Sequence, residues 1–125
     1  MNRPSAGQIQ TVLGAIAPDA IGITLPHEHL LVDFEVMFYP YQPSFDMPND
    51  GGRMAHVLAL IEAGHHDQIL MSHDIAYKTS LVKYGGYGYH HLLVNVVPRL
   101  RAKGVDDAGL TRLLVDNPAR AFAFA

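Results

Sequence analysis

A short apolar run that leads into two histidines constrains the fold of this chain more than any other feature. Residues 21–25, Ile-Gly-Ile-Thr-Leu, are followed by Pro26 and then by His27 and His29 at positions i and i+2. On an extended strand this spacing places both imidazoles on one face. Imidazole is the commonest protein ligand for zinc and similar metals. We therefore predict a strand over 21–25 that delivers half of a metal site; the alternative is a pair of ordinary strand-end histidines.

A second apolar run, Ile69 to Met71, lies in a predicted strand over 68–72 that ends at Ser72-His73-Asp74. Such a run suits a strand covered on both faces, as in a parallel sheet. An amphipathic helix is predicted over about 50–63, because apolar residues recur at i, i+3, i+4 and i+7. Asn49 or Asp50 can cap its start, and Gly64 can end it.

The alternation of strand, helix and strand places His27, His29 and Asp74 at the C-terminal ends of two strands. In α/β folds, active sites form at those ends. Asp74 is therefore a candidate third ligand or a general base toward a metal-activated water. The alternative is that its carboxylate caps the next helix.

The remaining elements are short. We predict a hairpin over 9–17 that turns at Gly14, and a long aromatic, proline-rich loop over 34–50. A helix over 91–103 is either kinked or restarted at Pro98. Asp106 is predicted to cap another short helix, and Asn117-Pro118 reads as an N-cap followed by a first-turn proline.

Other histidines and tyrosines give weaker signals. His73 is expected to pack or to support a ligand. Three more histidines are expected to be solvated, namely His56, His65 and His66. The pair at 90–91 is open to any role. The glycine-tyrosine loop at 84–89 lacks the spacing of a dinucleotide fingerprint. Its glycines permit mobility. Tyr77, Tyr84 and Tyr87 are candidates to line a substrate pocket, with a surface loop as the alternative.

Composition narrows the class of protein. Hydrophobic residues make up 49% and charged residues 17% of the chain, the net charge is −3, and there is no cysteine. These values exclude disulfides and thiolate metal sites, and they argue against nucleic acid or a membrane surface as a partner. With no apolar run long enough for a membrane span and no apolar signal core near Met1, we expect a cytoplasmic protein.

Several motifs in this order resemble the phosphotriesterase-like family of the amidohydrolase superfamily. The opening carries Gly7-x-Ile9-x-Thr11-Val12-x-Gly14-x-Ile16 and Gly22-x-Thr24-x-x-His27-Glu28-His29. The later part carries Ile69-Leu70-x-Ser72-His73-Asp74, Tyr84-Gly85-Gly86-x-Gly88-Tyr89 and Asn117-Pro118-Ala119-Arg120. The resemblance covers nearly all 125 residues.

The resemblance implies a (β/α)8 barrel with a binuclear centre, usually of zinc, that hydrolyses lactones and organophosphate esters. It places His27 and His29 at the end of strand 1 as ligands of the more buried metal. It places Asp74 at the end of strand 8, as a ligand of the same metal and the acceptor of a proton from the bridging hydroxide. The loop over 75–89 would shape the pocket for the leaving group.

The chain is too short for that barrel, which typically needs about 250 residues. No residue matches the family's bridging lysine or its two further histidines, which come from the middle strands. We therefore interpret the chain as one internally deleted α/β domain, a partial barrel and not a complete one. It would comprise a hairpin and metal-ligand strand over 1–33, a loop containing the join over 34–48, and the C-terminal barrel segment over 49–125.

By descent, the expected function is metal-dependent hydrolysis of a small ester or lactone, with one zinc or other divalent ion at most and little or no activity. The alternative is a catalytically silent remnant that binds metal or self-associates. A connection from strand 1 back to strand 8 would be left-handed, which is rare. We therefore expect strand exchange, association into a homo-oligomer or poor stability, and of these we favour association.

Overall fold

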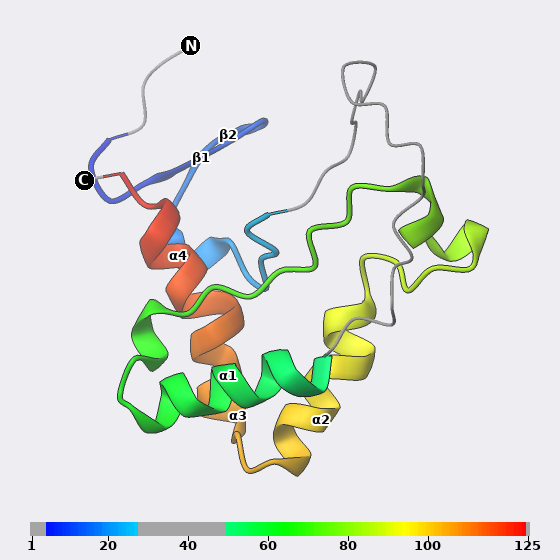
Figure 1. Ribbon diagram of the computed structural model, residues 1–125. Coiled ribbons are helices and arrows are strands. Elements are labelled where there is room, and N and C mark those ends of the chain that lie inside the picture. The colour runs from blue at the N-terminus through cyan, green and yellow to red at the C-terminus, as the bar shows by residue number, and fades with distance from the viewer. Residues whose placement is uncertain (1–4, 28–49, 125) are drawn as a thin grey trace, which may run out of the picture.

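The computed structural model describes residues 5–27 and 50–124. Within these residues the chain combines one small sheet with a group of helices, as Figure 1 shows. Its labelled elements are β1 (Ile9–Thr11), β2 (Gly14–Ile16), α1 (Asp50–Glu62), α2 (Val97–Ala102), α3 (Asp107–Thr111) and α4 (Asn117–Phe122). No helix in the described part of the chain is long and apolar enough to cross a membrane.

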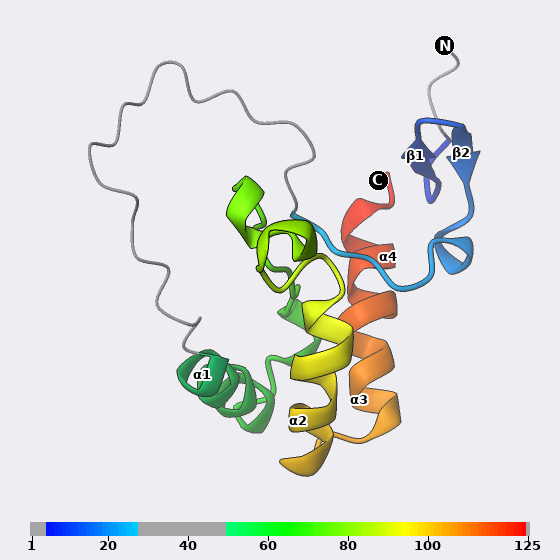
Figure 2. The ribbon, with the colours of Figure 1, turned by 90° about the vertical axis from the view of Figure 1, so that its right-hand side faces the viewer.

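The core lies among three helical rods. In Figure 2 the rod that ends in α2 runs beside the rod from α3 to α4, and α1 lies across them on one side. Leu100 from α2 and Leu113 from the second rod are almost completely buried, at 0% and 1% exposure. Met54 is the buried residue that α1 contributes, and Ile69 joins the same cluster from the segment after α1. Burying such side chains supplies the main driving force for folding.

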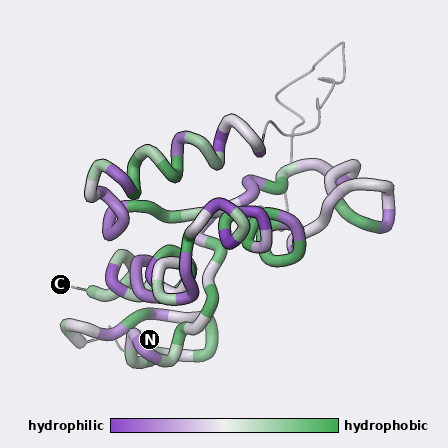
Figure 3. Tube along the Cα trace, turned by 90° about the horizontal axis from the view of Figure 1, so that it is seen from below, coloured by the Kyte–Doolittle hydropathy of each residue, from purple (hydrophilic) through white to green (hydrophobic). Residues whose placement is uncertain are grey.

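The helix α1 matches the prediction closely. Its apolar residues at helical spacing meet the core: Met54 is buried, and Val57, Leu58 and Ile61 pack against the cluster. Figure 3 shows the resulting alternation of hydrophobic and hydrophilic residues along this helix. Gly64 ends the helix in the left-handed conformation, at φ 85°, and its amide donates to the Ile61 carbonyl. A residue with a Cβ would be strained there.

Proline shapes the two long rods in the same way. A π-helical turn over Leu92–Val96 precedes α2, and another over Arg112–Asp116 precedes α4. Pro98 and Pro118 each occupy the second position of the following α-helix. Because proline lacks an amide proton and crowds the carbonyl four residues earlier, a wider turn before it relieves the clash. The predicted kink or restart at Pro98 is therefore a continuous rod with one widened turn.

The predicted hairpin forms, but its turn lies earlier than expected. β1 and β2 pair antiparallel with Ile9 opposite Ile16 and Thr11 opposite Gly14, so Val12 and Leu13 make the turn. Gly14 is instead the first residue of β2. The residues just before β1 contact the C-terminal segment through two backbone hydrogen bonds, from the Gly7 amide to the Phe124 carbonyl at 2.7 Å and from the Phe124 amide to the Gln8 carbonyl at 2.9 Å.

The two predicted parallel strands are absent from the described residues, and this prediction was wrong. Residues 21–25 and 69–72 have no ladder, and the hairpin is the sheet found in the described part of the chain. A strand needs a neighbour that satisfies its backbone groups. Here contacts with side chains and with a helical carbonyl replace a ladder: the Thr24 amide bonds the Leu114 carbonyl, and the Ile69 carbonyl accepts from Asn117. The segment 21–25 also does not begin extended, since Ile21 is helical and Gly22 has a φ of 67°. The architecture is mixed α and β, and the question of a left-handed crossover between paired strands does not arise.

Candidate functional site

Two of the three predicted metal ligands meet in the structure. The Nε2 atom of His27 lies 2.9 Å from Oδ1 of Asp74. Their side chains are 64% and 67% exposed, so the pair faces solvent. His29, the third predicted ligand, lies outside the described residues, as does the segment 34–48 in which we place the join.

Asp74 adopts an unusual backbone conformation. Among the described residues, Asp74 is the one residue other than glycine with a positive φ, which is 57°. Aspartate tolerates the left-handed region better than most residues, yet the conformation persists only where the surroundings impose it. The turn at Asp74 ends the extended segment and directs the carboxylate toward His27.

Ser72 joins the two segments that carry this pair. Its hydroxyl donates to the carbonyl oxygen of His27 at 2.7 Å and accepts from the amide of His27 at 3.2 Å. A hydroxyl carries one donor and two acceptor lone pairs, so one serine can satisfy both backbone groups. This contact takes the place of the predicted strand pairing.

The segment before His27 is held by the C-terminal helix. The amide of Thr24 donates to the carbonyl oxygen of Leu114 at 2.9 Å. In a regular α-helix that carbonyl would accept from the residue four positions on, but this residue is Pro118, which has no amide proton. Pro118 thus leaves the Leu114 carbonyl available for Thr24.

Asn117 holds the other segment. Its side chain is 1% exposed, and its Nδ2 donates to the carbonyl oxygens of His66 and Ile69, both at 2.8 Å. Arg120 completes the contact: it donates to the Asp67 carbonyl and, at 3.0 Å, to Oδ1 of Asn117. The prediction that Asn117 caps a helix was therefore wrong, because the residue lies inside a continuous rod and its amide serves the neighbouring chain. The motif Asn117-Pro118-Ala119-Arg120 is visible in the sequence, but the sequence does not show that it holds both segments of the site. Asn117 holds the segment at 66–69, and Pro118 leaves the Leu114 carbonyl to Thr24.

The donor set suits a divalent metal as far as the described residues go. A neutral imidazole nitrogen and a carboxylate oxygen are both ligands of zinc. Among residues 5–27 and 50–124 no group of three or more histidine, cysteine, aspartate or glutamate side chains is arranged to hold a metal. A complete site therefore requires a further ligand such as His29.

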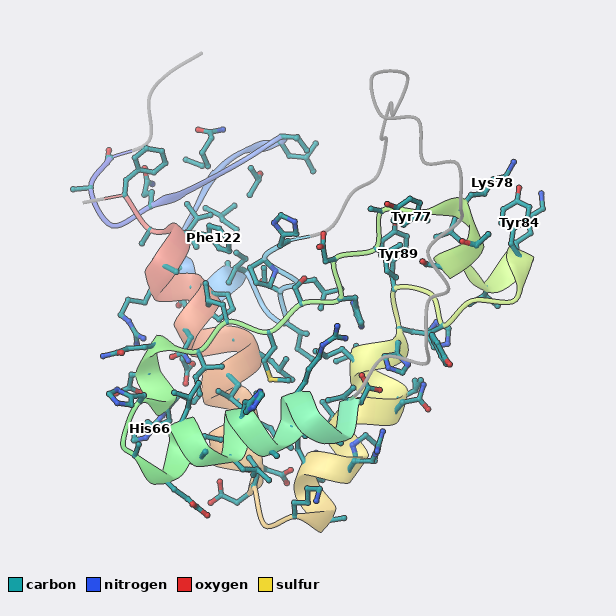
Figure 4. All side chains as sticks on the ribbon, viewed as in Figure 1. His66, Tyr77, Lys78, Tyr84, Tyr89 and Phe122 are labelled. Atoms are coloured by element: carbon teal, nitrogen blue, oxygen red, sulfur yellow. The ribbon has the colours of Figure 1, made fainter. Side chains whose placement is uncertain are left out.

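The loop tyrosines are spread out. Figure 4 shows Tyr84 beside Lys78 at the outer end of the loop, with Tyr77 and Tyr89 further in. The Lys78 ammonium lies 4.8 Å from the centre of the Tyr84 ring, a cation–π contact. Tyr87 instead packs against His91 in a tilted arrangement, with ring centres 4.7 Å apart and an interplanar angle of 53°. A different face carries an open groove of about 540 Å³, between the hairpin and the C-terminal residues Phe122 and Phe124, and neither His27 nor Asp74 lines it.

A second polar cluster surrounds His91, which is buried at 8% exposure. Its Nε2 lies 2.9 Å from Oδ2 of Asp50, and its Nδ1 lies 3.0 Å from Nδ2 of Asn95. An amide nitrogen only donates, so with this orientation Nδ1 accepts and Nε2 carries the proton given to Asp50. The same region includes His73, whose Nε2 accepts from the Leu92 amide at 2.6 Å. These contacts fix the start of α1 against the rod that contains α2.

Comparison with known proteins places this geometry in context. A sequence profile of the Phosphotriesterase family matches residues 35–122. The matched residues include Ser72, Asp74 and Asn117, whereas His27 and His29 precede them. The chain is 41% identical over 97 residues to an N-acetyltaurine hydrolase from Bos taurus and 42% identical to that of Homo sapiens. In each case the match covers 78% of this chain and 28% of the relative.

Solved structures similar to this chain also match it over only part of their own length. A resiniferatoxin-binding protein from Rhodobacter sphaeroides is 43% identical, with a TM-score of 0.59 over 61% of this chain and 21% of its own. A lactonase from Listeria monocytogenes is 40% identical, with a TM-score of 0.55 over 60% and 25%. A phosphotriesterase homology protein from Escherichia coli, solved with phosphate in its active site, is 35% identical, with a TM-score of 0.55 over 57% and 24%.

Proposed function

Because the chain belongs to the phosphotriesterase family, we propose that it carries part of a metal-dependent hydrolase site in which His27, His29 and Asp74 hold one divalent ion, such as zinc. The observation that carries the proposal is the 2.9 Å contact between the His27 imidazole and the Asp74 carboxylate, from segments far apart in the sequence. The substrate class is a small molecule with a hydrolysable acyl or phosphoryl bond. The lactonase and the N-acetyltaurine hydrolase among the relatives support this class.

The chemistry divides between the ion and the side chains. A divalent ion held by these residues would supply a Lewis acid for the substrate's carbonyl or phosphoryl oxygen and would activate water at neutral pH. His27 contributes a neutral nitrogen as ligand. Asp74 accepts the proton that the attacking water loses and returns it to the leaving group as the ester, lactone or amide bond breaks. With Asp74 in the left-handed region, its carboxylate lies beside the His27 imidazole, so both side chains would be available to hold the ion.

We further propose that this short chain turns over substrate very slowly. Side chains that are about two-thirds exposed sit in a high dielectric, where electrostatic stabilisation of a transition state is weak. The family's bridging lysine and second pair of histidines have no counterpart here, in keeping with an internal deletion that joins strand 1 to the segment before strand 8. The chain spans about 28% of the curated relatives it matches.

A silent remnant that self-associates is the second candidate. Both extended segments expose apolar side chains: Ile23 is 58% exposed and Leu70 is 43% exposed. Neither segment has a strand partner within the described residues. A second copy that covers these apolar side chains would account for association.

Zinc-dependent hydrolysis tests the proposal. The zinc-loaded chain is assayed against a panel of lactones, phosphotriesters and N-acyl substrates, beside Asp74→Asn and a metal-free sample. We expect turnover close to background in all three. Turnover that disappears in Asp74→Asn or on removal of zinc would show a working site and would contradict the expected inactivity. Sedimentation of the same sample decides between a monomer and an associated form.

A further inference from the structure

We propose that Ser72 is a positioning residue for the metal site, because its hydroxyl holds the His27 backbone in register with Asp74. The inference rests on the proposed function for its consequence toward zinc. The claim that Ser72 holds the His27 backbone rests only on the two hydrogen bonds between these residues.

The first step concerns what holds the two site segments together. The contact between His27 and Asp74 is exposed to solvent, and exposed side-chain contacts of this kind contribute little to stability. A contact this weak does not fix the relative position of two extended segments. The predicted ladder, which would have done so, is absent from the described residues. The contacts between Ser72 and the His27 backbone form a second connection between the same two segments.

Ser72 has the geometry to supply it. The 2.7 Å separation between its Oγ and the His27 carbonyl oxygen is typical of a well-formed hydroxyl hydrogen bond. The return contact from the His27 amide, at 3.2 Å, is at the long end of the normal range. Together they satisfy both backbone groups of one residue, as a neighbouring strand would.

The spacing explains why the residue sits at this position. Ser72 and Asp74 are two residues apart in the sequence, and both reach His27. One therefore holds the backbone of His27 while the other meets its imidazole. The Thr24 amide, bonded to the Leu114 carbonyl at 2.9 Å, anchors the same segment three residues earlier. With both anchors in place, the backbone of His27 is held beside the segment that carries Asp74.

The side-chain chemistry at position 72 is also restrictive. Ala or Val would leave the amide and carbonyl of His27 without this partner, whereas Thr retains a hydroxyl at the same atom. Partners that orient metal ligands typically change metal affinity by about 10–100-fold when removed. The expected loss for Ser72→Ala is therefore about tenfold, with Thr restoring most of it.

The test has one arm without metal and one with zinc. In the metal-free protein, amide hydrogen exchange at His27 is followed by NMR in wild type, Ser72→Ala, Ser72→Thr and the control Thr79→Ala, which removes an exposed hydroxyl from the following loop. Zinc affinity is then measured for the same four proteins by competition with a chromophoric chelator. We expect Ser72→Ala to raise the exchange rate at His27 several-fold and to weaken zinc binding about tenfold, while the other two variants stay near wild type.

The two arms separate failure of this inference from failure of the proposed function. An unchanged exchange rate at His27 in Ser72→Ala overturns the positioning role, whatever the zinc result. Equal zinc affinity in Ser72→Ala and wild type also overturns it. If the wild-type chain binds no zinc, the proposed function fails, and the consequence that we assign to Ser72 toward the metal fails with it. If Ser72→Thr weakened zinc binding and raised the exchange rate as much as Ser72→Ala, the hydroxyl would not be the group that positions His27.

Discussion

Replacing Asn117 by alanine should destabilise the protein more than any other single polar change we consider. The side chain is 1% exposed and donates to two backbone carbonyls, at His66 and Ile69. Alanine leaves the buried Ile69 carbonyl unsatisfied, at a cost of about 2 kcal/mol, and the partly buried His66 carbonyl at about 1 kcal/mol. The expected loss in the free energy of unfolding is therefore about 3 kcal/mol.

Urea unfolding followed by circular dichroism measures this loss. With a denaturant slope of about 2 kcal/mol/M, the midpoint should fall by about 1.5 M. Asn117→Asp has nearly the same shape but places a carboxylate oxygen against the two carbonyls, so it should be at least as destabilising as alanine. Thr111→Ala, an exposed change on the same rod, should stay within about 0.5 kcal/mol of wild type.

The comparison of the two substitutions isolates the hydrogen bonds from packing. If Asn117→Asp were as stable as wild type, or if Asn117→Ala cost less than about 0.5 kcal/mol, the docking role of Asn117 would be refuted. The chain from 66 to 69 leads directly to Ser72 and Asp74. Loosening it should therefore also raise amide exchange along that segment.

Three further changes test other parts of the fold. Gly86→Ala should lower the melting temperature by several degrees in a fluorimetric melt. The new Cβ would lie 2.2 Å from the Ser80 carbonyl carbon, and overpacking typically costs about 1–3 kcal/mol. An unchanged melting temperature would show that the loop is freely mobile. Asp50→Ala should lower the free energy of unfolding by about 2 kcal/mol in chemical denaturation, since the His91 Nε2–H loses its acceptor. Asp50→Asn keeps an acceptor and should recover most of that loss. Equal stability of the two variants would contradict the assigned tautomer. The double change Val12→Ser and Leu13→Ser should leave the monomer's stability within about 0.5 kcal/mol, since these side chains are 101% and 98% exposed; a larger loss would mean that the hairpin tip is covered in solution.

Local sequence signals predicted the local structure well. The helix α1, its glycine stop and the cap at Asp106, which accepts from the Gly109 amide at 2.8 Å, follow from patterns within a few residues. The hairpin follows too, with its turn displaced to Val12 and Leu13. In each case the residues that determine the element also contain its hydrogen-bond partners.

The predictions failed where the partners lie elsewhere in the chain. An apolar run predicts a buried extended segment, but only a neighbouring segment makes it a strand, and none pairs with 21–25 or 69–72 in the described residues. Asn117 before Pro118 has the sequence of a helix cap, yet two distant carbonyls determine its role. The glycine at 86 suggests mobility, whereas the structure uses it for close approach to Ser80. Likewise, the sequence suggested that His27 and Asp74 lie near each other, but not that a serine joins their segments.

Metal stoichiometry is the most direct test of the central claim that His27, His29 and Asp74 form one reduced metal site. The purified chain is equilibrated with zinc, freed of loosely bound ions by gel filtration, and analysed for metal and protein content in parallel with a variant carrying His27→Ala and His29→Ala. The account predicts at most one tightly bound ion per chain in wild type and none in the variant. Two tightly bound ions per chain, or one ion that survives both substitutions, would contradict it.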